Sequence, residues 1–422
     1  MKKTHAWLII SFTICFLFPV KIQSQMKQNT YPGEVETVLK KSGKNRTELE
    51  KFLIYCRHSK DPLKWDAACF LVRNMDIHYS EVYYWVYDKN NKITYNELSY
   101  PNYSQAIKAF DDLSAQKKMK PVISIVYDMH VLKADYLIKN LEMAFKAWKS
   151  PQGNHLNFHE FCEYLLPYRN ITEALEDWRP SYLKFFSPVN KNSIKSSVRD
   201  AANLLNNRLT GNFISSFSYE DKRSPVAFIS PSQMLFRKRG HCEDMVNFTL
   251  FAFKSQGIPC RIDMVPYHGT STGRHYWNAT IDEQHRVVPF EGSKKSIEQF
   301  MLKREPSKVI SITYAKQPDA LANLITKEEI PDNYLRNFNF VDVTDQYWPV
   351  HDLTVRLNKT ENKAVAYIAV LNGLSWRPAY WGKINKGQVI FPKMACGVVY
   401  LTSVYSNGKL MPAAYPVILF SN

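Results

Sequence analysis

The pattern of apolar positions divides the chain into a mostly helical first part, a mixed middle part and a strand-rich last part. In DPLKWDAACFLVRNMDIH, Asp61 suits an N-cap and Pro62 a first helical position. Apolar residues then recur at helical spacing: Leu63, Ala67, Ala68, Leu71 and Val72. The stretch NFHEFCEYLLPYRN begins with Asn157 as a cap and is stopped by Pro167. Residues 30–165 are therefore expected to form a helical packing domain.

The middle part alternates between helix and strand patterns. Residues 193–209 predict an amphipathic helix. In RGHCEDMVNFTLFAFKSQGIPCR, a second helix is expected to follow Cys242 and to end near Gly257. Its buried face is expected to consist of Met245, Phe248, Thr249, Ala252 and Phe253. IPCRIDMVPYH and HYWNATID then predict two strands separated by a Gly/Ser/Thr loop.

Short alternating segments dominate the chain from about residue 338 onward. LTVRL, KAVAYIAVL, RPAYWGKI, GQVIF and GVVYLTSVY predict strands, and Asn407-Gly408 is a strong hairpin signal. We expect an antiparallel, sandwich-like β domain whose role is packing or spacing. The predicted fold class is α+β, with an N-terminal helical domain (25–167), a catalytic domain (168–330) and this C-terminal β domain (331–422).

The N-terminus has the features of a secretory signal over residues 1–24. Lys2 and Lys3 give a basic start, residues 7–20 are apolar, and Ser24 offers a cleavage point. An uncleaved signal anchor is the alternative. The signal predicts a secreted, periplasmic or cell-envelope protein.

The charge and the cysteine content of the chain limit the classes of partner, metal and cofactor that are expected. The net charge of +16 falls to +13 without residues 1–24, and it is spread along the chain. It suits a solvated basic surface, or attraction to anionic envelope partners such as acidic glycans. Nucleic acid is disfavoured because no binding motif occurs. There is no CxxC pair, so no zinc site, other metal or cofactor is predicted. A bridge between Cys56 and Cys69 remains open.

Cys242 is the candidate nucleophile. Gly240 allows a sharp turn into the helix, and a helix N-terminus favours thiolate and is expected to lower the pKa of Cys242. Free backbone N–H groups there can hold an oxyanion. A buried cysteine at a helix cap would give the same pattern. The choice therefore depends on whether a base accompanies the thiol.

His275 is the candidate base and Glu291 its orienting acid. If the strands around them pair as a hairpin about residues 282–285, Glu291 lies near His275. Asn278 could also orient a histidine, but three residues along a strand it points to the opposite face. His268 and His285 look like loop residues.

These motifs resemble the core of the transglutaminase-like superfamily: RGHCEDM, SQGIPCR, RHYWNAT and VVPFEGS, within residues 225–295. The resemblance implies a papain-like fold with Cys242 as nucleophile, His275 as general base and Glu291 at a position where most members have aspartate. It also implies a structural role at the helix start for Asp244, as for Gly240 and Asn278. Trp277 and His241 are assigned to the substrate groove beside the catalytic residues.

The resemblance implies an exported thiol acyl-transfer enzyme that acts on a peptide, protein or envelope substrate. Because water is present at ~55 M, hydrolysis is the default and transamidation comes second. A different class is a non-catalytic envelope protein that uses the fold to bind a glycan or peptide. A third reading is a structural module with Cys242 buried or bridged to Cys260. The sequence does not fix the oligomeric state.

Overall fold

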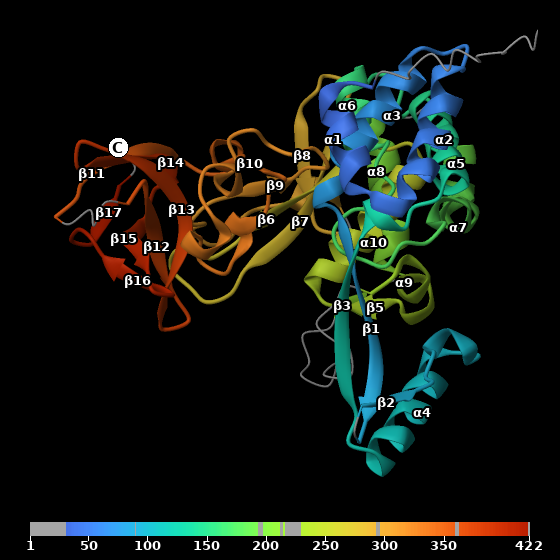
Figure 1. The fold of residues 1–422 in the computed structure, drawn as a ribbon, viewed down its shortest axis with the longest axis horizontal. Helices are drawn as coiled ribbons and strands as arrows, with labels where there is room; N and C mark the ends of the chain where they lie inside the picture. The colour runs from blue at the N-terminus through green and yellow to red at the C-terminus, as the bar shows by residue number, and fades with distance from the viewer. Residues whose placement is uncertain are drawn as a thin grey trace, which may run out of the picture.

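The computed structural model of the chain describes residues 31–88, 90–192, 197–211, 214–215, 229–292, 296–358 and 363–420. The expected signal segment, 1–24, lies outside them. The described part comprises N-terminal helices, a projecting arm, a central unit of helices and sheet, and a C-terminal sheet (Figure 1). Helices and antiparallel sheets are both present, so the predicted α+β class is confirmed. The domain limits given above stay predictions.

The N-terminal helices begin where the sequence offers caps. The backbone N–H of Leu63, the first residue of α3, donates to Asp61 Oδ1 at 3.1 Å. Asn157 and Glu160 form a capping box at the start of α6, which ends at Tyr164. The apolar faces of these helices share one core. The helices are α1 (Gly33–Lys41), α2 (Arg46–Arg57), α3 (Leu63–Arg73), α5 (Ala134–Trp148) and α6 (Phe158–Tyr164).

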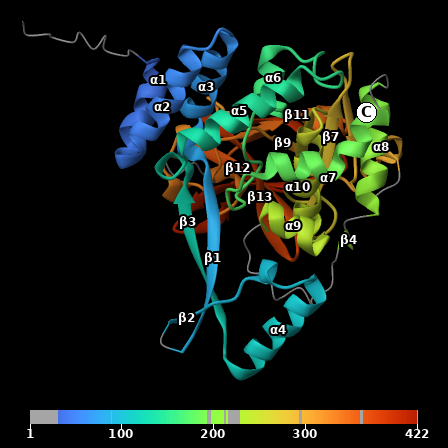
Figure 2. The ribbon, with the colours of Figure 1, turned by 90° about the vertical axis from the view of Figure 1, so that its right-hand side faces the viewer.

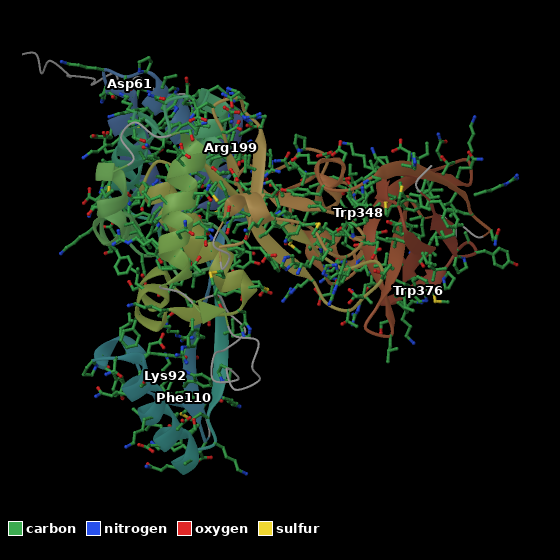
Figure 3. The ribbon with its side chains drawn as sticks, turned by 180° about the vertical axis from the view of Figure 1, so that it is seen from behind. Asp61, Lys92, Phe110, Arg199, Trp348 and Trp376 are labelled. Carbon is green, nitrogen blue, oxygen red and sulfur yellow. The ribbon has the colours of Figure 1, made fainter. Side chains whose placement is uncertain are left out.

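A projecting arm interrupts the helical region. The sequence pattern did not predict this arm. Strand β1 (Tyr79–Tyr87) pairs antiparallel with β3 (Lys120–Tyr127), and β2 (Asn91–Ile93) extends this sheet. Helix α4 (Tyr103–Gln116) lies toward the far end of the arm (Figures 1 and 2). The ring centroids of Trp85 and Phe110 are 4.9 Å apart. Phe110 is labelled on the arm in Figure 3. Trp85 therefore packs in a local core of the arm, whereas Tyr83 and Tyr84 are half-buried.

Helix α10 (Cys242–Ser255) lies at the centre of the next unit. The five residues expected on its buried face are all buried, and the burial extends to every residue from Asp244 to Ser255. The helix ends before Gly257, which has a φ of 76°. The expected helix at 193–209 is α8, which begins later because Ser197 caps it. The surrounding helices are α7 (Trp178–Asn192), α8 (Val198–Thr210) and α9 (Pro231–Arg237).

A five-stranded antiparallel sheet packs against α10 in the order β10-β9-β6-β7-β8. Its strands are β6 (Cys260–Val265), β7 (His275–Ile281), β8 (Val287–Phe290), β9 (Ile310–Ile312) and β10 (Phe340–Asp342). The predicted β7–β8 hairpin is confirmed, with Ile281 opposite Val287. A short parallel pair, β4 (Ile214–Ser215) and β5 (Arg239–Gly240), precedes α10.

The C-terminal strands form one antiparallel path in the order β11-β14-β13-β12-β15-β16, with β17 also on β15. Asn407 and Gly408 have φ values of 50° and 76° at the β15–β16 turn, which confirms the hairpin signal. The strands are β11 (Val350–Arg356), β12 (Val365–Asn372), β13 (Ser375–Asn385), β14 (Gln388–Ala395), β15 (Val398–Ser406), β16 (Lys409–Pro412) and β17 (Val417–Leu419).

The cysteines in the described part of the chain are free thiols. Cys56 and Cys69 are therefore not bridged, and the reading in which Cys242 is bridged to Cys260 is wrong. None of the described helices has the length and apolar character needed to cross a bilayer.

Candidate active site

Cys242 is the first residue of α10, and Asp244 fixes the turn that leads into it. The Asp244 carboxylate accepts a hydrogen bond from the backbone N–H of His241 at 2.9 Å. A Cβ on Gly240 would lie 2.6 Å from the Asp244 Cβ. Glycine is therefore needed here for this close approach. The left-handed backbone turn is made two residues earlier, at Lys238, with a φ of 53°.

The thiol of Cys242 contacts the carboxylate next to it in the chain. Its Sγ donates to Glu243 Oε2 at 3.0 Å. Burial, followed by the charge and hydrogen bond of Glu243, raises the pKa of Cys242 to about 12. The prediction of a lowered pKa is wrong for this arrangement. A helix N-terminus contributes about 0.3–1 kcal/mol, less than one pKa unit, so burial and the carboxylate prevail.

Replacing Glu243 with glutamine tests this balance. Without the carboxylate, the pKa of Cys242 should fall, and more thiolate should be present at pH 8. Each pKa unit lost raises the thiolate fraction about tenfold below the pKa. We expect iodoacetamide to alkylate Cys242 about tenfold faster in Glu243→Gln, measured by mass spectrometry. Glu298→Gln, an exposed exchange elsewhere, is the control; an unchanged rate in Glu243→Gln would contradict the assigned cause.

The structure brings His275 and Glu291 together through the β7–β8 hairpin. His275 Nε2 lies 3.1 Å from Glu291 Oε1, and the two side chains are 33% and 19% exposed. This contact occupies Nε2 and leaves Nδ1 to meet a reactant. The side chain of Glu291 thus reaches the imidazole of His275 directly.

Trp277 supports the histidine from within the core. Its ring centroid is 5.6 Å from that of His275, and it packs against Phe300 and Tyr347. Trp277 is fully buried, so its assignment to a substrate groove is wrong for this structure. His241 is exposed at the start of α10, and its contact with substrate stays a prediction.

The chain neighbours of His275, at the start of β7, contact the start of α10, where Cys242 lies. Arg274 Nη2 forms an ion pair with Glu243 Oε1 at 3.0 Å. Tyr276 shares a core cluster with Cys242. Successive residues of a strand point to opposite faces, so His275 lies on the face of Trp277. Within the described residues, Cys242 donates a hydrogen bond to Glu243 and makes none to His275.

Asn278 does not orient the base. Its amide donates to the carbonyl of Val246 on α10 at 3.1 Å and to that of Arg261 at 3.4 Å. It therefore ties the sheet to the helix that begins with Cys242. Among the described residues, no group of three or more His, Cys, Asp or Glu side chains could hold a metal ion.

Comparison with known proteins matches this part of the chain to a family. Residues 190–291 match the model of the transglutaminase-like superfamily. This segment is a transglutaminase-like domain. It contains Cys242, His275 and Glu291. The match supports the assignment of a thiol enzyme of that superfamily, without specifying its reaction. No curated protein matches the chain.

One solved structure, from Cytophaga hutchinsonii, is named a putative cysteine protease. It is 12% identical, with a TM-score of 0.22, over 27% of this chain and 38% of its own. The chain therefore spans well under half of that protein. Similarity at this level carries no argument about the present protein.

Sequence reasoning missed three residues around the transglutaminase-like domain. Glu243 and Arg274 are direct neighbours of Cys242 and His275, so adjacency alone could have drawn attention to them. Asn372 offered no signal, because it comes from β12 of the C-terminal sheet. Its side-chain amide donates to the carbonyls of His268, Ser271 and Gly273 at 3.2, 2.9 and 3.0 Å. Its Oδ1 accepts the Gly273 N–H at 3.1 Å.

Asn372 thus clamps the loop that leads into His275, and removing the clamp should loosen that loop. At about 1 kcal/mol per net hydrogen bond, Asn372→Ala is expected to weaken the loop by roughly 2–4 kcal/mol. Amide exchange of Gly273 should then be at least about tenfold faster by mass spectrometry. Asn385→Ala, at an exposed hairpin end, should leave the loop unchanged. Equal protection in Asn372→Ala and the native protein would exclude the clamp.

Proposed function

We propose that the transglutaminase-like domain is a thiol acyl-transfer enzyme that hydrolyses a peptide or isopeptide amide. The Cys242 sulfur attacks the carbonyl carbon as His275 Nδ1 takes the thiol proton. The C–N bond then breaks, and His275 returns that proton to the leaving amine. Water attacks the resulting thioester, releasing the carboxylic acid and restoring the thiol.

The hydrogen bond between His275 Nε2 and Glu291 is the observation that carries this proposal. A base held by a carboxylate through one nitrogen presents the other in a defined orientation. Cys242 stands at a helix start, where first-turn N–H groups lack helical acceptors and suit a developing oxyanion. Arg274 and Glu243 join these two elements directly.

In its contact with Glu243, the thiol of Cys242 is the hydrogen-bond donor, so it is protonated in the resting site. With a pKa near 12, the thiol is almost wholly neutral at pH 7. In the proposed reaction the Cys242 side chain rotates away from Glu243, so that its Sγ meets His275 Nδ1. His275 thus acts as a general base during attack, which is typically worth 10²–10⁴-fold.

The substrate class that we propose rests on the net charge of the chain and on its expected export. A net charge of +13 without residues 1–24 favours an anionic peptide or cell-envelope polymer, with an acidic glycan as a further partner. Export to the periplasm, envelope or exterior belongs to this proposal. Hydrolysis is favoured over transamidation because water is the more abundant acceptor.

A non-catalytic binding protein is the second candidate, and one observation favours it. Cys242 is bonded to Glu243, and its pKa is raised, the reverse of an activated thiol. In that case the domain would bind an envelope glycan or peptide without turnover.

Trapping the thioester distinguishes the two candidates. A pool of tryptic peptides is incubated with the protein, quenched in acid and analysed by mass spectrometry. We expect an acyl adduct on Cys242 together with cleaved or deamidated peptides, and both should disappear in His275→Ala. Peptide retention without an adduct or product would overturn the proposal and support the binding protein.

A further inference from the structure

A cavity of about 380 Å³ lies at the far end of α10 from Cys242. Its lining comes from α6, from the chain around Asn170, from the last turn of α10, from β6 and from the segment after β9. His159 and Pro318 are exposed, so the lining reaches the surface. Its volume falls within the range of small-molecule sites, about 300–1,000 Å³.

Lys254 sets this cavity apart from an ordinary packing gap. The residue is 3% exposed, and its Nζ donates to Asn170 Oδ1 at 2.8 Å and to the Arg169 carbonyl at 3.5 Å. Both acceptors are neutral. Among the described residues, no carboxylate forms an ion pair with Lys254. A buried ammonium is normally held in an ion pair, and Lys254 has none within the described part of the chain, although the charges of Glu173 and Glu163 act on it from further away.

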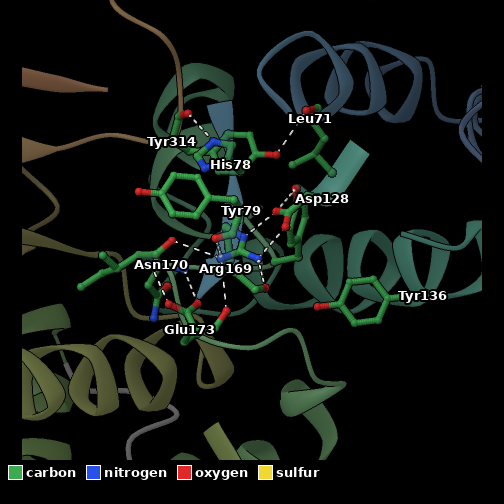
Figure 4. Close-up of polar contacts among 12 residues, drawn as sticks. Leu71, His78, Tyr79, Asp128, Tyr136, Arg169, Asn170, Glu173 and Tyr314 are labelled. Atoms are coloured by element: carbon green, nitrogen blue, oxygen red, sulfur yellow. Dashed lines mark hydrogen bonds and ion pairs between the residues drawn. The ribbon is translucent and has the colours of Figure 1, made fainter. Parts of the chain in front are cut away.

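The other cations of the lining are already neutralised by neighbouring acids. Figure 4 shows Arg169 held by Asp128, with Nε to Oδ2 at 2.5 Å. The remaining two ion pairs are Arg261–Asp263 at 2.9 Å and Lys316–Asp76 at 2.7 Å. Among the Lys and Arg side chains of the lining, Lys254 is therefore the one without an ion pair to a described residue, and it is available to bind an anion.

The one acidic side chain of the lining is committed to backbone amides. Glu163 accepts the N–H of Tyr314 at 2.8 Å and that of Ala315 at 3.2 Å, so both its oxygens are used. It fixes the segment after β9 and does not pair with Lys254. The rest of the wall includes the apolar side chains of Leu250, Ile262 and Val341.

We propose that this cavity binds a small monocarboxylate with an apolar body, whose carboxylate pairs with Lys254. A single uncompensated ammonium matches a single negative charge, whereas phosphate would bring about two. The apolar wall would cover the body of the ligand. The site is separate from Cys242 and does not rest on the proposed acyl-transfer function.

The electrostatics of Lys254 make this binding dependent on pH. Burial first, and then Arg179, lower the pKa of Lys254 to about 7. The groups that oppose this shift are Glu173, Cys260 and Glu163. A carboxylate at the ammonium would raise that pKa again. Binding therefore takes up a proton, and affinity should fall by up to about tenfold per pH unit above about 7.

Thermal unfolding with defined probes tests the site. Benzoate, phenylacetate and hexanoate are added at pH 6, with benzamide as the neutral match of benzoate. At least one carboxylate should raise Tm, while benzamide should not. Lys254→Met should lose the shift, and Lys316→Met, at a paired lining lysine, should keep it. The proposal is overturned if no carboxylate acts, if benzamide acts equally, or if Lys254→Met retains the effect.

Isothermal titration calorimetry on the native protein tests the site even if Lys254→Met does not fold. Binding of the active carboxylate to the native protein is measured at pH 6 and pH 8, in two buffers of different ionisation enthalpy. We expect tighter binding at pH 6 and net proton uptake at pH 8. Binding that is independent of pH, with no proton uptake, would exclude Lys254 as the partner.

Discussion

Cys242→Ala is expected to abolish turnover of the peptide pool, with a loss of at least about 10³-fold in rate. Removal of a nucleophile leaves only the binding and oxyanion contributions, which cannot form the thioester. The change also removes the Sγ contact with Glu243, but it leaves the capping contact of Asp244 with His241 in place. The rate of product formation is measured by mass spectrometry.

Cys260→Ala is the matched control for that loss. Cys260 is buried at 1% exposure on β6, and its Sγ contacts the Arg261 carbonyl. Its loss should cost some stability while sparing turnover. If both alanine variants lost activity in parallel with Tm, the effect of Cys242→Ala would be structural. If Cys242→Ala kept the native rate, another group would carry the chemistry.

The sequence was most informative where neighbours in the chain are also neighbours in space. The β7–β8 hairpin spans few residues, so alternation and turn signals were enough to place Glu291 beside His275. The start of α10 was likewise evident from Gly240 and the apolar run after Cys242. Such local patterns depend on backbone geometry that short segments dictate themselves.

Side-chain electrostatics at Cys242 could not be predicted in the same way. The helix dipole is implied by any helix start, but the burial of Cys242 depends on packing from β7 and the surrounding chain. The direction in which Glu243 turns is likewise set by tertiary contacts. Here Arg274 holds one oxygen of Glu243 while the other accepts the thiol. The largest cause of the raised pKa of Cys242 is its burial, which depends on packing outside the motif.

Long-range elements escaped sequence reasoning for a related reason. The aromatic run around Trp85 lacks a clear alternation of apolar and polar positions, and it pairs with β3 more than thirty residues away. Asn372 lies about a hundred residues from the loop that it clamps. An asparagine near a strand end is an ordinary surface residue in sequence. Its role becomes visible only when β12 is placed against that loop.

Asp128→Asn is expected to give the largest loss of stability in the N-terminal part. Arg169 donates to Asp128 Oδ2 and Oδ1 at 2.5 and 2.6 Å, and both residues are at most 2% exposed (Figure 4). Asparagine keeps the size but leaves the guanidinium buried without a counter-charge. Breaking such a pair costs about 3–5 kcal/mol, which should lower the urea midpoint clearly.

Asp177→Asn provides the comparison, because Asp177 pairs with Lys139 at the surface with exposures of 46% and 52%. An exposed pair contributes about 0–1 kcal/mol, so its urea midpoint should hardly move. Arg169 also donates to the Tyr79 carbonyl at 2.7 Å, at the root of the arm. Amide exchange in β1 should therefore quicken in Asp128→Asn. Equal midpoints for the two variants would mean that the buried charge is compensated by groups other than Asp128.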